Sequence, residues 1–131
     1  MSKNAALQAI ANRLTADIPS VTWTRRALTR EQVSLAGGPW PTGCVVGYQG
    51  VHGDQPGNPW RMDVKLLVHA RSTTGNANAE MLDLLDRVEA SLSNATDIDG
   101  VAHVQLANAT IDQDDDQDGS CGLFVTLIVT L

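Results

Sequence analysis

The residues of this chain with the clearest potential for chemistry are five aspartates in the segment 112–118: Asp112, Asp114, Asp115, Asp116 and Asp118. The spacing Asp114-x-Asp116-x-Asp118 before Gly119 matches the first half of a calcium loop, in which oxygen ligands alternate ahead of a glycine turn. The second half does not follow, since the glutamate expected at loop position twelve falls on Val125. We therefore favour a solvated hairpin tip or an acidic assembly surface over a calcium site formed by Asp114, Asp116 and Asp118.

The other reactive side chains form no recognisable site. His52, His69 and His103 share no metal-binding spacing. His69 and His103 could face each other across neighbouring strands, although a satisfied strand histidine is the favoured interpretation. Cys44 and Cys121 are too few and too far apart for a disulfide framework, and we expect buried structural thiols. No nucleophile elbow and no phosphate-binding glycine fingerprint is present. The sequence predicts no catalytic residue, cofactor or metal, and a protein that is not an enzyme.

The strongest structural pattern is a strand followed by a helix between residues 60 and 92. Residues 60–70 are rich in β-branched and apolar side chains on both parities, which predicts a central, largely covered strand. From Ala79 the apolar period changes to about 3.6, and Met81, Leu84, Leu85, Val88 and Leu92 form one stripe. This pair is the expected core nucleus.

The remaining elements complete an α+β pattern. We expect a first helix over 5–16 capped by Ser2 or Asn4, and strands over 21–27, 44–52, 101–107 and 122–131. Residues 28–43 lose any period. The fold class predicted is α+β, with a mixed, mostly antiparallel sheet of four to five strands, two main helices packed on it, and an extended β-hairpin. At this length the chain, residues 1–131, is expected to form a single domain.

Charge is distributed unevenly along the chain, whose formal net charge is −6. Residues 1–30 carry five basic groups against one acid, whereas residues 71–119 carry eleven acids against two arginines. A surface with one basic and one acidic flank can dock head to tail on a second copy. Arg25, Arg26 and Arg30 are the basic interface candidates, and Trp40, held between prolines, is the apolar one.

Composition also excludes several function classes. No apolar run approaches the roughly 20 residues that a membrane-spanning helix needs, and no membrane partner is expected. The N-terminal residues show no signal-peptide pattern, so the expected compartment is the cytoplasm. Basic and aromatic residues are too sparse for a nucleic-acid reader that acts as a monomer.

The order of these elements resembles the tail terminator proteins of long-tailed bacteriophages, also called tail completion or tail-to-head joining proteins. The likeness is carried by the strand over 60–70, the helix over 79–92, the strand over 101–107, the acidic hairpin and the terminal run 123–131. It implies an α+β protomer that closes into a hexameric ring on the finished tail tube. The implied partners are further copies of the chain, the tail tube protein and the head–tail connector, with DNA only as passing cargo.

This resemblance also implies a structural viral protein of the virion tail or neck, assembled in the host cytoplasm. The five aspartates of 112–118 would then line a pore or rim. Two other classes remain open: a different phage neck or head–tail adaptor protein, and a small non-viral binding module, with or without dependence on calcium.

Overall fold

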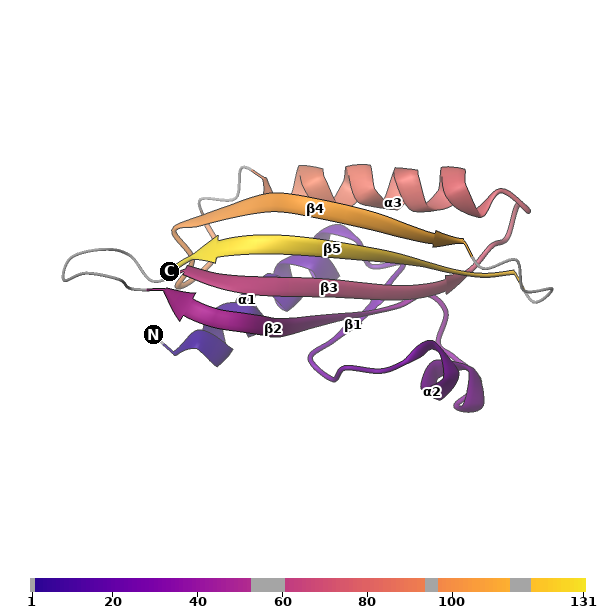
Figure 1. The fold of residues 1–131 in the computed structure, drawn as a ribbon, viewed down its shortest axis with the longest axis horizontal. Coiled ribbons are helices and arrows are strands. Elements are labelled where there is room, and N and C mark those ends of the chain that lie inside the picture. The colour runs from indigo at the N-terminus through magenta and orange to yellow at the C-terminus, as the bar shows by residue number, and fades with distance from the viewer. Residues whose placement is uncertain (1, 53–60, 94–96, 114–118) are drawn as a thin grey trace.

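The computed structural model describes residues 2–52, 61–93, 97–113 and 119–131. Its elements are α1 (Lys3–Asp17), β1 (Thr22–Thr24), α2 (Arg30–Leu35), β2 (Thr42–His52), β3 (Arg61–Arg71), α3 (Ala77–Leu92), β4 (His103–Gln113) and β5 (Ser120–Thr130). The five strands form one sheet in the order β1-β2-β3-β5-β4 (Figure 1). β1 pairs parallel to β2, and every other pairing is antiparallel. The predicted α+β class and mixed, mostly antiparallel sheet are confirmed.

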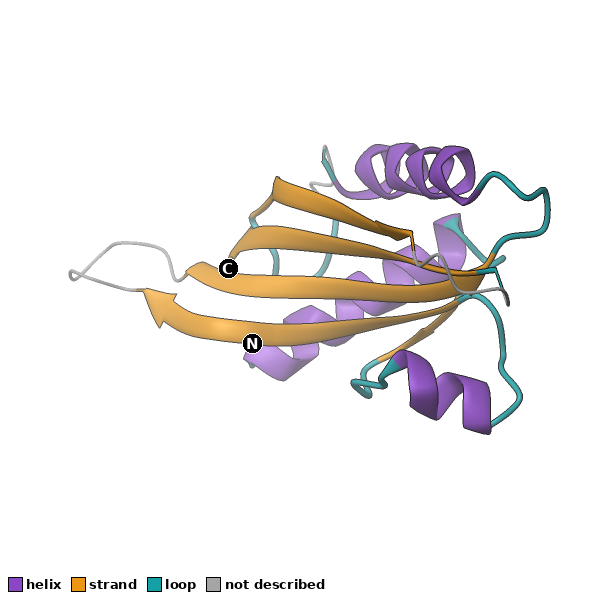
Figure 2. Cartoon of the chain, turned by 45° about the vertical axis from the view of Figure 1, so that its right-hand side comes forward, coloured by secondary structure: helices purple, strands orange, loops and turns teal. Residues whose placement is uncertain are grey.

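Helices α1 and α3 lie on the same face of this sheet (Figure 2). The alternate residues of β3 and β5 that point at them are buried; Val64, Leu66, Val68, Leu123 and Leu127 are all fully inaccessible. The apolar stripe of α3 is largely as predicted, with Leu92 and Val88 fully buried and Leu85 only half-buried. Strand and helix therefore form one core, as the change of period indicates.

The opposite face of the sheet is less covered than the sequence predicts. On β3, Asp63, Lys65 and Leu67 are half-buried, and only His69, near the strand end, is buried. The prediction of a largely covered strand is right for one face only. Leu67 points to the side of β3 opposite Val64, Leu66 and Val68. This face of the sheet has no helix over its middle (Figure 1).

The N-terminal half shows where local patterns succeed and fail. The Ser2 hydroxyl accepts the Ala5 N–H at 3.1 Å and caps α1, as one of the two predicted caps, and Ile18, before Pro19, follows its last residue. The strand expected over 21–27 is reduced to the three residues of β1. The aperiodic segment 28–43 contains the short helix α2, which the prediction missed. Its signal was the pair Thr29 and Gln32, which form a reciprocal capping box.

Both long hairpins are antiparallel, as expected. β4 begins at His103 and continues to Gln113, beyond the predicted end, because β5 begins at Ser120 and supplies partners for that part. His69 and His103 do not face each other, since β5 separates their strands and they lie opposite Gly122 and Thr130, respectively.

Candidate interaction surfaces

His69, Cys44 and Cys121 are buried in the fold, and their surroundings favour a structural role. Nε2 of His69 lies 3.0 Å from the Leu28 carbonyl oxygen, which requires the proton to be on Nε2, and the ring meets Phe124 edge-on. Burial lowers the pKa of His69 and outweighs the effect of the Leu28 carbonyl, so the neutral ring is favoured. Cys44 and Cys121 are buried, as predicted, and burial raises the pKa of both thiols. Both cysteines are therefore kept as thiols, the less nucleophilic form.

The polar corner before α3 is organised by Glu80. Its carboxylate accepts hydrogen bonds from the Ser72 hydroxyl and from the backbone N–H and hydroxyl of Thr73, both at 2.9 Å. These donors, Ser72 first, lower the pKa of Glu80 to about 2. The charged form therefore holds the turn that leads from β3 into α3.

We expect this carboxylate to make stability depend on acid pH. Because the folded-state pKa is depressed, the stabilisation is complete above the unfolded-state value of about 4.5 and is lost as the pH falls towards about 2. Glu80→Gln should lower the free energy of unfolding at neutral pH by less than about 1 kcal/mol, since the site is close to solvent. It should also flatten the pH dependence in that window. Urea unfolding at a series of pH values, with the exposed Glu89→Gln as control, measures both effects; equal slopes for the two variants would contradict this role.

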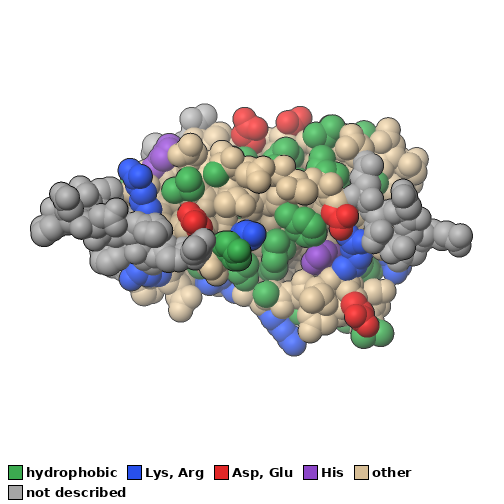
Figure 3. Space-filling model, viewed as in Figure 1, with side chains coloured by type: hydrophobic (Ala, Val, Ile, Leu, Met, Phe, Trp, Pro, Cys, Tyr) green, Lys and Arg blue, Asp and Glu red, His purple; other side chains and the backbone are tan. Residues whose placement is uncertain are grey.

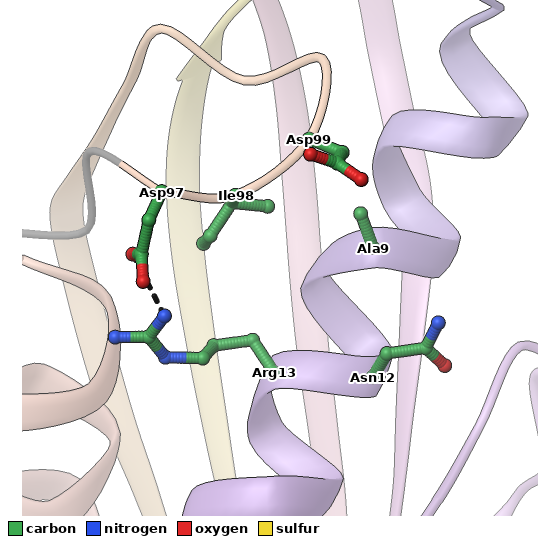
Figure 4. A pocket seen from close by; sticks show the side chains of 6 residues that line it. All are labelled: Ala9, Asn12, Arg13, Asp97, Ile98 and Asp99. Carbon is green, nitrogen blue, oxygen red and sulfur yellow. Dashed lines mark hydrogen bonds and ion pairs between the residues drawn. The ribbon is translucent and has the colours of Figure 1, made fainter.

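Arg13 joins α1 to the segment after α3. Its guanidinium donates to Asp17 and to Asp97, both at 2.8 Å, and forms ion pairs with them. Arg13 lines an open hollow with Ala9, Asn12, Asp97, Ile98 and Asp99 (Figure 4). Since its positive charge already faces two carboxylates, this hollow is better suited to holding the two segments together than to binding an anion.

Arg25 holds internal contacts that the sequence does not reveal. Its Nε donates to the Val45 carbonyl oxygen at 2.9 Å, and Nη1 and Nη2 donate to the backbone and side-chain oxygens of Asn4 at 3.0 and 3.3 Å. The side chain therefore ties the start of α1 to β2. Arg26, the next residue, is exposed. Of this neighbouring pair of interface candidates, Arg26 has the more accessible side chain.

The third basic candidate is joined to the acidic segment within one chain. Arg30, the first residue of α2, forms an ion pair with Asp112 near the end of β4. These residues are 82 positions apart, and the pair connects the start of α2 to the end of β4. Asp114, Asp115, Asp116 and Asp118 lie outside the described residues.

Trp40 is half-buried, and its ring lies 4.7 Å from the guanidinium carbon of Arg71 in a cation–π arrangement. Its loop also contacts β1, since Thr22 N–H donates to the Pro41 carbonyl at 3.0 Å. The Trp40 ring therefore has a contact within the chain and also keeps an accessible surface. Its role in an interface between copies stays a prediction.

The open face of the sheet carries apolar side chains between charged ones (Figure 3). By strand register, this face includes Val46, Leu67, Phe124 and Ile128. Tyr48, on the same face, is 61% exposed, and the ammonium of Lys65 lies 3.9 Å from the centre of its ring. Among the residues described, no three His, Cys, Asp or Glu side chains are grouped to hold a metal ion. In the same part of the chain, no helix has the length and apolar character needed to cross a membrane.

Comparison with known proteins gives a fold relationship and no family. No protein-family model and no curated protein matches the chain. Among solved structures, the chain is similar to a chain of the virion of a native gene transfer agent particle, with a TM-score of 0.65 and 12% identity over 98% of each chain. A second solved chain matches with a TM-score of 0.53 and 16% identity, over 100% of this chain and 96% of the other. At these identities the matches show a shared fold, over nearly the whole of each chain.

Proposed function

We propose that this protein is a structural component of a phage-like virion. The observation that carries the proposal is the match, end to end in both chains, to a chain of a gene transfer agent virion. The surroundings of His69, Cys44 and Cys121 agree with this proposal, because these potentially reactive groups are buried within the fold.

Within that class we propose the role of a tail terminator. The protein would form a ring, most simply a hexamer, on the end of the tail tube, stop tube growth and offer the head connector a docking surface. The order of helices and strands supports this role, and so does a sheet with an open face and a long edge strand, β4, whose residues 103–111 include no Lys, Arg, Asp or Glu. The proposed location is the tail or neck of the virion, after assembly in the host cytoplasm.

The aspartates of the acidic segment have a place in this proposal. Asp112, Asp114, Asp115, Asp116 and Asp118 would line the pore or rim of the ring, where their negative charge would keep passing DNA from adhering. Asp112 is the described member, and its pairing with Arg30 neutralises part of that charge.

We expect the purified protein to assemble beyond the monomer and to act on tubes. Sedimentation over a concentration series should show a six-fold species, alone or in the presence of the tail tube protein of the same virion. Added during tube polymerisation, the protein should shorten the tubes and appear at one end in electron micrographs. A monomer at every concentration that leaves tube length unchanged would contradict the proposal. Retained monomer with micromolar calcium binding by titration calorimetry would instead favour a calcium module.

A further inference from the structure

One edge of the sheet is only partly covered. β1 pairs with β2 at three positions, Thr42, Gly43 and Cys44, whereas β2 continues to His52. At the next position the carbonyl oxygen of Val45 accepts the hydrogen bond from Arg25 Nε at 2.9 Å, so a side chain takes the place of a strand there. From Val46 to His52, no strand of the described chain lies on the outer side of β2. Tyr48, the most exposed aromatic residue described, projects from this stretch.

The opposite edge of the sheet is β4, which has β5 as its sheet neighbour and none on its outer side within the described residues. Proteins normally protect such an edge with charged side chains, prolines or bulges, because its free N–H and C=O groups can pair with another chain. Residues 103–111 of β4 contain no Lys, Arg, Asp, Glu or Pro. They have a single irregularity, between Leu106 and Asn108, and Gln105, Asn108 and Thr110 are exposed. This composition is typical of a strand that receives a partner.

Strand directions make the two edges compatible. Direction alternates from β2 through β3 and β5 to β4, so β2 and β4 run in opposite senses. Rotation of a second copy about an axis roughly along the strands keeps these senses, and it brings the β2 edge of that copy against β4 of the first. The resulting pair is antiparallel, and the alternation continues across the junction. Such a contact joins two different surfaces and can close into a ring.

We propose that β4 of one copy pairs, through its first half, with the Val46–His52 stretch of β2 in the next copy. This inference rests on the proposed ring function and names the surface that joins its subunits. Opposite charges lie near the two edges, since Arg26 follows β1 beside the β2 edge and Asp112 lies near the end of β4. These charges favour the correct approach of the two edges. A pairing of β4 with β4 would also be antiparallel, but it stops at a dimer and leaves the Val46–His52 edge uncovered.

Cysteine cross-linking tests this contact. Tyr48 and Asn108 are both exposed. Asn108 lies on the open face by its register opposite Thr126, and Tyr48, at a register shift of β2, lies there by its contact with Lys65. In the Tyr48→Cys, Asn108→Cys double variant, a short bis-maleimide should produce a ladder of dimers, trimers and larger species. A second double variant, Tyr48→Cys with Gln105→Cys, allows for a different register. The natural Cys44 and Cys121 are 2% and 0% exposed, so they should contribute little background.

The single variants distinguish the outcomes. Tyr48→Cys or Asn108→Cys alone should remain at least tenfold less cross-linked than the double variant. Dimers from Asn108→Cys alone would indicate β4–β4 pairing and overturn the inference. Oligomers by sedimentation without a ladder in either double variant would overturn the edge contact and leave the proposed function standing. Absence of an oligomer in the parent protein at every concentration, together with no ladder in either double variant, would overturn both.

Discussion

Truncation of Leu92 to alanine should lower the free energy of unfolding by about 2–5 kcal/mol. Leu92 ends α3, is fully inaccessible, and belongs to the cluster that joins α3 to the sheet. The change removes apolar burial and leaves a cavity that the surrounding strands fill only in part. Urea unfolding with an unchanged denaturant dependence would report this loss directly.

The same helix supplies graded controls. Leu85 is half-buried and Leu82 is 45% exposed, and each carries the same side chain as Leu92. Leu82→Ala should cost less than about 1 kcal/mol, and Leu85→Ala should fall between the other two. A loss as large for Leu82 as for Leu92 would mean that α3 presents a different face to the sheet.

This order of effects also shows how much of the core the sequence predicts. Period alone places Met81, Leu84, Val88 and Leu92 correctly, because burial on one helix face repeats locally every 3.6 residues. Ser91 breaks that pattern: it is buried, and its hydroxyl donates to Asp17 at 2.7 Å. A polar residue at a buried position requires a partner, and that partner lies 74 residues away on α1. Local periodicity contains no such information.

The candidate surfaces were predictable to a smaller extent for the same reason. The sequence identifies Arg25, Arg26 and Arg30 as one basic group, but the structure gives them different surroundings. Arg25 contacts residues 20 and 21 positions away, Arg30 pairs with a residue 82 positions away, and Arg26 is exposed. Charge and spacing along the chain do not distinguish an arginine that holds two elements together from one that faces a partner. The pairing of strands determines which of these arginines has a partner within its own chain.

Charge reversal at the two neighbouring arginines should separate these roles. Arg25→Glu removes the donors to Val45 and Asn4 and places a carboxylate beside their oxygens, which should lower the free energy of unfolding by about 2–3 kcal/mol. Arg26→Glu makes the same change in net charge at an exposed position, and should alter monomer stability by less than about 0.5 kcal/mol. Urea unfolding of both variants at a concentration that keeps them monomeric gives the comparison, and equal losses would contradict the internal role of Arg25.

Association between copies, unlike the stability of the monomer, should be sensitive to the Arg26→Glu change. If this side chain faces the acidic flank of the next copy, Arg26→Glu weakens the oligomer while the monomer melts normally. The defect should be greatest at low salt, because like charges across the contact are then least screened. Exposed pairs contribute only about 0–1 kcal/mol each, so a loss of association of up to about fivefold per contact is expected. Sedimentation across a salt series measures this loss, and an oligomer indifferent to both the reversal and the salt would remove Arg26 from the interface.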